Sequence, residues 1–362
     1  MNENFNLQEY ITTGVERFVA NTLKATLKNP RETAFMLKFA AASKKASAYR
    51  KKREAEGFHI PAFLIASITN RCNLHCEGCY SRDTHATSDE ASGTLLSAGD
   101  WADIFRQATE LGVSFIVLAG GEPLLRRDVI EAAANVKSIL FPVFTNGTFL
   151  TEEYKDLFNK NRNLLPVLSM EGMRGTTDKR RGKGIYDMVT LNMSDLQKKN
   201  IVFGISVTVT TENITEVLSD DFVNDAVARG AVFIFYVEYV PIDDNNGDIA
   251  PGEKEWEFLT KRVETLRESV KNLVFVSIPG DEQAAGGCLA AGRGFFHINA
   301  KGDAESCPMS PFSDVNVKST SLEEALRSPL FARLKESGLL SDHHRGGCAL
   351  AAQKEAVKKM ME

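Results

Sequence analysis

Three cysteines stand within eight residues, directly after a short β-branched segment of the chain. Cys72, Cys76 and Cys79 form a C-x3-C-x2-C pattern in the stretch SITNRCNLHCEGCYSR. The other three of the six cysteines all lie in the last quarter of the chain: Cys288, Cys307 and Cys348. A disulfide framework is typical of short secreted chains, whereas this chain has 362 residues and no recognisable secretory signal. Two groups of three thiols instead predict two metal sites.

The composition is that of a globular protein. Hydrophobic residues make up 43% of the chain and charged residues 25%, which is enough apolar material for a sizeable core. The formal net charge of −5 argues against a general nucleic-acid binder. The first ten residues, MNENFNLQEY, lack the basic start and apolar run of a signal peptide, and no later run is long enough to span a bilayer. We therefore expect a cytoplasmic protein without a nucleic-acid partner.

The chain divides into three regions, which we expect to be 1–57, 58–280 and 281–362. The first is predicted to be helical and amphipathic, and it holds eleven basic and six acidic residues. Its apolar stripe is expected to pack against the rest of the protein. The alternative is peripheral contact with a membrane surface, in which basic residues meet anionic lipid and four apolar side chains enter the interface: Phe18, Phe35, Met36 and Phe39.

In the central region, short β-branched or aromatic runs alternate with longer amphipathic runs, which is typical of repeated βα units around a parallel sheet. Six strands are predicted: Phe63–Thr69, Phe115–Ala119, Leu140–Thr145, Leu165–Met170, Val202–Thr210 and Val232–Val240. Six helices are predicted, at about 98–111, 127–137, 152–160, 185–198, 215–229 and 252–271. Six units are fewer than the eight of a closed barrel. The predicted fold is α/β, a partial (β/α)6 TIM-type barrel with an N-terminal helical extension and a small C-terminal cysteine-containing module.

The cysteine loop follows the first predicted strand, where a parallel-sheet enzyme keeps its site. Three thiolates on a tight loop can hold three irons of a [4Fe–4S] cube and leave the fourth iron open. A zinc site that uses His75 is the alternative, but structural zinc normally takes four ligands with paired C-x2-C spacing. After the second strand comes Gly-Gly-Glu-Pro, in which the glycines allow close backbone approach and Glu122 can bind an ammonium group.

The cysteine loop followed by Gly-Gly-Glu-Pro resembles the radical S-adenosylmethionine (radical SAM) superfamily. The resemblance implies a catalytic [4Fe–4S] cluster on Cys72, Cys76 and Cys79. It also implies that the open iron binds SAM, whose reductive cleavage gives a 5′-deoxyadenosyl radical that abstracts hydrogen from a substrate. In one departure from the family pattern, the residue before the third cysteine is usually aromatic and here is Gly78, with Tyr80 after the cysteine.

The same resemblance implies a set of SAM contacts at the strand ends. The implied contacts are Gly120, Gly121 and Glu122 for the methionine amino group, and Ser169 and Arg181 for the rest of SAM. By their places on the predicted strands or at the strand ends, Asn146, Glu171 and Ser206 are predicted to line the same site. Ser169 and Glu171 share one face of a strand by its two-residue period. Arg180 is the competing choice for Arg181. For each of the residues beyond Glu122, the alternative is a polar strand end that is satisfied within the fold.

The last region carries Cys288, then Gly302 and Cys307 in the spacing C-x13-G-x4-C, and Cys348 near the end. Helices are predicted near 321–328 and 349–361. The spacing is similar to the start of SPASM and twitch modules, which implies one auxiliary [4Fe–4S] cluster on these three cysteines. Candidates for a fourth ligand stand just before the last cysteine: Asp342, His343 and His344. A zinc knuckle is the alternative.

The predicted function is that of a radical SAM enzyme that abstracts hydrogen from a peptide or protein side chain. The alternatives are a small metabolite, lipid or cofactor precursor as substrate, and a non-catalytic iron–sulfur protein that transfers electrons. Expected partners are SAM, the substrate and an electron donor such as flavodoxin or ferredoxin.

Overall fold

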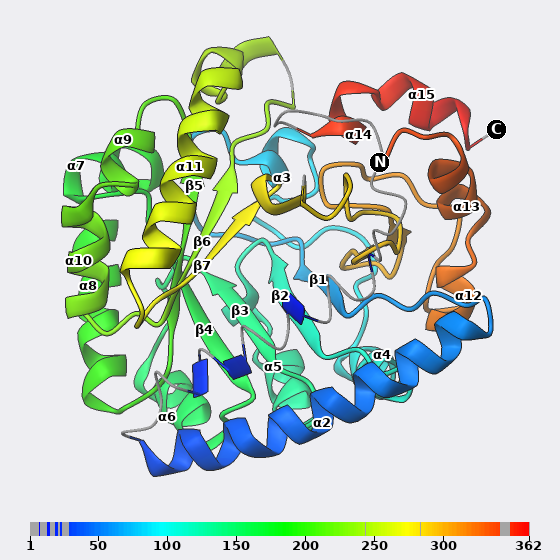
Figure 1. The fold of residues 1–362 in the computed structure, drawn as a ribbon, viewed down its shortest axis with the longest axis horizontal. Helices are drawn as coiled ribbons and strands as arrows, with labels where there is room; N and C mark the ends of the chain where they lie inside the picture. Colours follow the sequence, from blue (N-terminus) through cyan, green and yellow to red (C-terminus); the bar gives the residue numbers. More distant parts are fainter. Residues whose placement is uncertain are drawn as a thin grey trace.

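One curved sheet organises the protein in this computed structural model (Figure 1). The structure describes residues 29–242, 244–282, 284–340 and 348–361, together with residues 7, 13, 14, 19, 20, 22 and 23. Within these residues the sheet has nine strands in the order β7-β6-β5-β4-β3-β2-β1-β8-β9. The strands are β1 Phe63–Thr69, β2 Phe115–Gly120, β3 Phe141–Thr145, β4 Leu164–Ser169, β5 Gly204–Val209, β6 Phe233–Glu238, β7 Val274–Ile278, β8 His297–Ile298 and β9 Ala304–Glu305.

The first seven strands pair in parallel and in chain order, as βα units require. All six predicted strands are confirmed, with ends that differ by at most two residues. A seventh parallel strand, β7, lies beside β6 and was not predicted. Strand β8 of the last region pairs in parallel with β1, so the barrel and the C-terminal region share one sheet.

Helices connect the strands and lie around the outside of the sheet (Figure 1). The helices of the barrel are α3 Tyr80–Asp83, α4 Ala98–Glu110, α5 Arg127–Ala134, α6 Glu152–Lys160, α7 Arg174–Arg181, α8 Ile185–Lys198, α9 Ile214–Val217, α10 Asp220–Ala228 and α11 Glu253–Ser269. Those of the last region are α12 Leu322–Leu326, α13 Pro329–Glu336, α14 Ala349–Ala352 and α15 Lys354–Lys359. One-turn 3-10 segments lie at Pro123–Leu125 (η1) and Gly280–Glu282 (η3), and a third lies at Asp244–Ile249 (η2).

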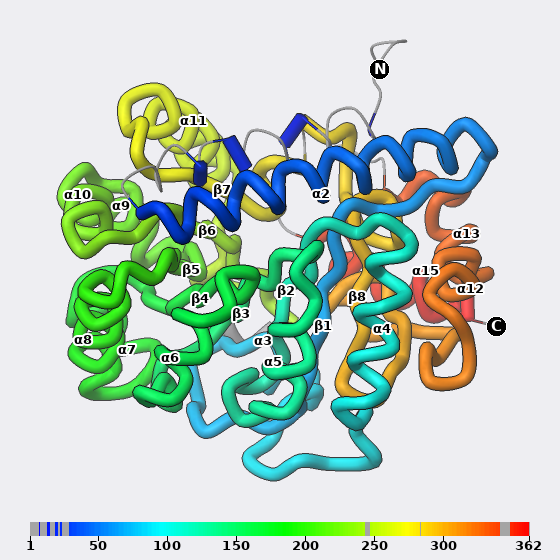
Figure 2. The backbone as a smooth tube through the Cα atoms, turned by 90° about the horizontal axis from the view of Figure 1, so that it is seen from below, coloured from blue at the N-terminus to red at the C-terminus, as the bar shows by residue number. Residues whose placement is uncertain are grey.

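Helix α2 (Pro30–Ala55) closes the end of the barrel where the strands begin (Figure 2). Its Asn29 N-cap and Pro30 set the start of the helix. Phe39 is fully buried and meets the Phe115 ring edge-on, with the ring centroids 5.5 Å apart. Met36 is buried in the same cluster, with residues from the starts of β4 and β6. Helix α2 therefore covers the end of the sheet where the strands begin.

The burial of Met36 and Phe39 corrects one expectation. The alternative in which they enter a membrane interface is wrong, because both side chains are inside the protein and 3% or less exposed. Phe35 packs against the same cluster, and Phe18 lies outside the described side chains. Among the described helices, none is both long and apolar enough to cross a bilayer.

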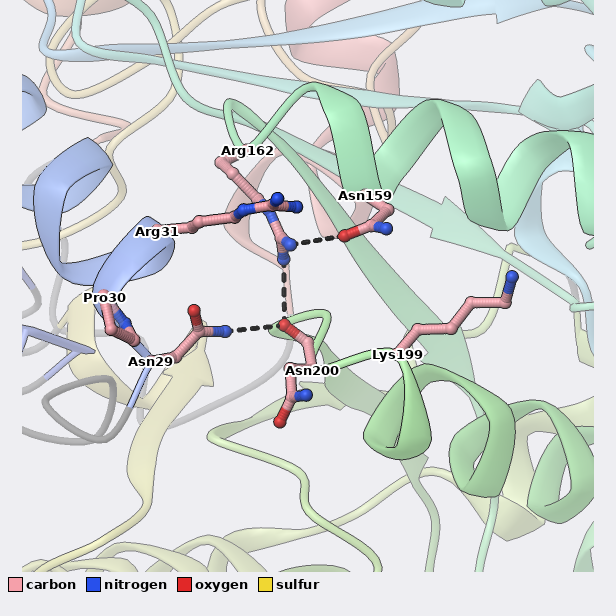
Figure 3. A pocket seen from close by; sticks show the side chains of 7 residues that line it. All are labelled: Asn29, Pro30, Arg31, Asn159, Arg162, Lys199 and Asn200. Carbon is pink, nitrogen blue, oxygen red and sulfur yellow. Dashed lines mark hydrogen bonds between the residues drawn. The ribbon is translucent and has the colours of Figure 1, made fainter.

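A small pocket at this closed end lies between the start of α2, the end of α6 and the turn after α8 (Figure 3). Asn200 accepts hydrogen bonds through its carbonyl oxygen from the Asn29 amide (2.8 Å) and from Arg162 (2.9 Å). Arg162 also pairs with Glu32 of α2, and Lys199 pairs with two carboxylates of α6. The hydrogen bonds and ion pairs around this pocket therefore attach the start of α2 to the barrel.

Candidate active site

The carboxyl ends of the parallel strands meet at one edge of the sheet, and the cysteine loop lies there. Cys72, Cys76 and Cys79 follow β1, and Cys79 is the N-cap of α3. The remaining predicted SAM contacts lie at the ends of β2 to β4 or just beyond them, apart from Ser206 inside β5, which pairs with the last residue of β4, and Arg180 and Arg181 at the end of α7. The fold thus brings the predicted residues to one edge, as a parallel sheet dictates.

The two glycines after β2 permit a close approach of two backbones. A Cβ atom on Gly121 would lie 2.0 Å from the Arg71 carbonyl oxygen, and one on Gly120 would lie 2.3 Å from that of Thr69. The Gly121 amide donates to Thr69 (2.9 Å) and the Glu122 amide donates to Arg71 (2.8 Å). Gly120 also has φ +121°, which favours glycine. These contacts fix the chain that enters the cysteine loop.

The Glu122 carboxylate joins the end of β2 to the end of β3. It is 1% exposed and accepts hydrogen bonds from the Thr145 hydroxyl (2.7 Å), the Asn146 amide (2.8 Å) and the Leu124 amide (3.0 Å). Burial raises the pKa of this carboxyl group, and the three donors act in the opposite direction. The predicted contact of Glu122 with the methionine amino group stays a prediction; the role that its contacts establish is structural.

Replacing Glu122 by alanine is therefore expected to destabilise the protein as well as weaken SAM binding. The change leaves three buried donors without an acceptor, at about 1–3 kcal/mol for each group that stays unsatisfied. Thermal unfolding and SAM titration of the loaded protein measure the two effects. Glu131→Ala is the control, because Glu131 pairs with Arg127 on the exposed surface of α5. An unchanged melting temperature for Glu122→Ala would contradict the structural role.

Glu171, two residues after the end of β4, is the centre of a buried ion-pair network. Its carboxylate is fully buried and accepts from Arg180 (2.9 Å), Arg181 (2.7 Å) and the Thr208 amide (2.8 Å). Burial acts to raise the pKa of Glu171, but Arg181 and Arg180 together hold it below its ordinary value. Arg180 also donates to the Gly78 carbonyl (3.2 Å) inside the cysteine loop. The network therefore ties β4 and β5 to that loop.

Both candidate arginines act at this site, in different ways. Arg181 reaches the loop through a guanidinium nitrogen 3.9 Å from the Cys76 sulfur, whereas Arg180 contacts only backbone of the loop. The Asn146 amide nitrogen lies 4.0 Å from the Cys72 sulfur. Donors that face sulfur favour thiolate ligands over thiols, which suits a metal-bound state.

The loop thiols are partly buried, and charged groups lie close to two of them. Burial raises the pKa of Cys72 and of Cys76, and neighbouring thiolates raise each further, whereas Arg181 and Arg180 oppose this at Cys76. Among the described residues, no group of three or more His, Cys, Asp or Glu side chains is placed to hold one metal ion. Thiols with a guanidinium donor beside Cys76 and an amide donor beside Cys72 fit an iron–sulfur cluster, which thiolates hold.

Tyr239 occupies the space beside Gly78, where the family pattern has an aromatic side chain. Gly78 has φ +61°, and a Cβ atom on it would lie 2.7 Å from Tyr239 Cε2. Tyr239 follows β6 and is 5% exposed. The sequence analysis placed Tyr239 inside the predicted strand Val232–Val240 and gave it no role. An aromatic residue after a strand was the one available signal, and it does not indicate which loop the ring contacts.

The two serines predicted to contact SAM lie side by side on neighbouring strands of the sheet. Ser169 and Ser206 pair in register on β4 and β5, and both are nearly buried, at 9% and 8% exposed.

The Asn213 amide, which the sequence analysis did not name, donates to the carbonyl oxygens of Glu171 (3.0 Å) and Thr208 (2.8 Å). Asn213 therefore fixes the turn that presents Glu171.

The three C-terminal cysteines also come together, from three separate segments. Burial raises the pKa of Cys288, Cys307 and Cys348, and at Cys288 and Cys307 the charge of neighbouring thiolates raises it further. Cys348 begins α14 and its sulfur accepts from the Ala351 amide (3.4 Å). Asp342, His343 and His344 lie outside the described residues.

Tyr80 stands between the two cysteine groups. Burial raises the pKa of its hydroxyl, and the charges of Cys79, Cys307 and Glu305 raise it further. Tyr80 therefore lies near a cysteine of each group. This places the C-terminal cysteines on the same side of the barrel as the cysteine loop.

Residues 66–220 match the family model described as the radical SAM superfamily. The AdoMet-dependent heme synthase of Methanosarcina barkeri is 24% identical over 82% of this chain and 90% of its own length. The Bacillus subtilis protein SkfB, a sporulation killing factor maturation protein, is 32% identical, but over only 49% of this chain and 42% of its own. The chain likewise covers 38% of the Fe-coproporphyrin III synthase of M. barkeri, at 28% identity.

Solved structures share the fold. Streptococcus suis SuiB bound to S-adenosylmethionine superimposes with a TM-score of 0.67 at 19% identity, over 86% of this chain and 77% of SuiB. The enzyme anSMEcpe with bound AdoMet has a TM-score of 0.59 at 15% identity, over 83% of this chain and 95% of its own. At these identities the likeness establishes a common fold.

Proposed function

Because residues 66–220 match the radical SAM family model, we propose that this chain is a radical SAM enzyme that abstracts hydrogen from a peptide or protein side chain. The observation that carries the site assignment is the cysteine loop held by the Glu171–Arg180–Arg181 network at the open end of the barrel. Cys72, Cys76 and Cys79 would hold the catalytic [4Fe–4S] cluster, and SAM bound there supplies a 5′-deoxyadenosyl radical. An electron donor such as flavodoxin or ferredoxin would reduce this cluster.

The chain's own residues position and shield this chemistry. Gly120 and Gly121 bring the end of β2 against the chain that enters the loop, where the carbonyls of Thr69 and Arg71 accept hydrogen bonds from its amides. Arg181 places a positive charge beside Cys76, and Asn146 places an amide beside Cys72. Helix α2 fills the opposite end of the barrel and keeps water out of it from that side.

The peptide assignment is supported by a relative and by a common fold. SkfB is by its name a maturation protein, and SuiB has been solved bound to its precursor peptide SuiA, in a fold that covers 89% of this chain with a TM-score of 0.66. A second candidate is a tetrapyrrole or similar small molecule, which the AdoMet-dependent heme synthase favours because that match spans most of both chains.

Substrate-dependent formation of 5′-deoxyadenosine separates the two candidates. Reduced, cluster-loaded protein is incubated with SAM and either synthetic peptides encoded beside its gene or iron-coproporphyrin III. The proposal expects a peptide to accelerate 5′-deoxyadenosine formation and to change in mass. Acceleration by the porphyrin alone, with every peptide unchanged, would contradict the peptide assignment and favour the second candidate.

The C-terminal cysteines would hold an auxiliary [4Fe–4S] cluster. Anaerobically reconstituted protein is then expected to bind about eight irons, and replacing Cys288, Cys307 and Cys348 by alanine should remove about four. Metal analysis with Mössbauer spectroscopy measures this. Zinc in the wild-type protein, with iron unchanged in the triple variant, would refute the auxiliary cluster.

A further inference from the structure

Glu282 is a buried carboxyl group that the function proposed so far does not use. It ends η3, directly after β7, and is 5% exposed. Its amide donates to the Pro279 carbonyl (2.7 Å), and its own carbonyl accepts from the amides of Ala285 and Gly287 (both 3.0 Å). The chain therefore folds back over Glu282 and brings the first C-terminal cysteine to its carboxyl group.

The Glu282 carboxyl group lies among all three cysteines of the last region. One of its oxygens accepts from the Leu289 amide (3.3 Å), and the Cys288 thiol hydrogen-bonds to it. Its negative charge also acts on Cys307 and Cys348. Four groups that can lose a proton thus converge from η3, the turn after it, the chain after β9 and the start of α14.

Among the described residues, Arg293 places a positive charge near two of these four groups. It acts on Glu282 and Cys288, and its guanidinium also donates to backbone carbonyls, including that of Leu340 (3.1 Å). Burial raises the pKa of Glu282 to about 7 and that of each cysteine above its ordinary value. A buried carboxyl group in contact with one of three converging thiols completes a set of four donors of the kind that a metal cluster takes.

We propose that Glu282 is the fourth protein ligand of the auxiliary cluster, beside Cys288, Cys307 and Cys348. The inference rests on the proposed function, which assigns a cluster to those three cysteines. A [4Fe–4S] cube takes four protein ligands when it is closed, and one of the four may differ from cysteine, as imidazole replaces thiolate in other iron–sulfur centres. The fourth iron is therefore bound by a carboxylate oxygen in this chain, and this cluster has no open iron for a substrate.

The test isolates the auxiliary cluster in a full-length chain in which Cys72, Cys76 and Cys79 are replaced by alanine. In this background the protein should bind about four irons. Adding Glu282→Ala is expected to leave one iron open, so that mild oxidation releases about one iron and gives the electron paramagnetic resonance (EPR) signal of a three-iron cluster. Glu282→Cys should restore the fourth iron, because a thiolate replaces the lost ligand.

Glu238→Gln is the matched control. Glu238 is 3% exposed and its charge acts on Glu282, yet it is not among the main influences on the three thiols. It should keep four irons with an unchanged spectrum. Glu282→Ala and Glu282→Gln variants that keep four irons and the wild-type EPR spectrum after mild oxidation would overturn the ligand role. A background protein that is folded by circular dichroism but binds no iron–sulfur cluster would instead overturn the auxiliary cluster itself.

Discussion

Replacing Glu171 by alanine is expected to lower the free energy of unfolding by about 3–5 kcal/mol, because it leaves buried charges without a partner. The carboxylate is fully buried, and its two arginine partners are 14% and 10% exposed. The Thr208 amide also loses its acceptor. Urea unfolding of the loaded protein, under anaerobic conditions, measures the loss.

The control is an ion pair of the same chemistry on the surface. Arg174 and Asp187 pair with both side chains about 60% exposed, so Asp187→Ala should change stability by less than about 1 kcal/mol. Equal losses of stability in Glu171→Ala and Asp187→Ala would show that the buried network stabilises the protein no more than an exposed ion pair does.

The same network sets a dependence on pH. Because its arginine partners hold the pKa of Glu171 below the ordinary value, the stabilisation is fully present above the pKa of the unfolded chain, about 4.3. It is lost as the pH falls through the lower pKa of the folded state. The difference in stability between wild type and Glu171→Gln should therefore hold down to about pH 4 and shrink below it. A difference that already shrinks between pH 7 and pH 5 would contradict this.

Much of the fold follows from local pattern. The six predicted strands are β-branched or aromatic runs bounded by turn residues, and their parallel order places every strand end at one edge. The seventh strand, Val274–Ile278, has the same character but is five residues long and follows a long helix, at the boundary expected for the next region. Pattern alone does not say whether such a run joins the sheet, since that depends on the free edge of β6.

The site residues also divide into those that local sequence pattern predicts and those that depend on tertiary packing. The two-residue period of a strand places Ser169 and Glu171 on one face, and the structure has Ser169 beside Ser206 in the sheet. The contact of Tyr239 with Gly78 joins segments about 160 residues apart, and that of Glu282 with Cys307 and Cys348 also depends on tertiary packing. No local spacing encodes such contacts, so they emerge only when the chain is folded.

Cys76→Ala is expected to abolish cleavage of SAM. Cys76 is one of only three thiols on the loop, and Arg181 faces its sulfur, so its loss removes a cluster ligand that no neighbouring side chain replaces at that position. Cys348→Ala should leave slow cleavage intact, because Cys348 belongs to the other group of thiols. The two cysteine variants therefore separate the catalytic loop from a general loss of iron.

The most direct test of the account is 5′-deoxyadenosine, measured by mass spectrometry after reconstituted protein is reduced anaerobically with SAM. Wild-type protein is predicted to form it slowly without substrate, Cys348→Ala to form it as well, and Cys76→Ala to form none. Wild-type protein that is fully loaded and reduced, yet forms no 5′-deoxyadenosine even with substrate-containing extract, would contradict the assignment and leave an electron-transfer protein as the explanation.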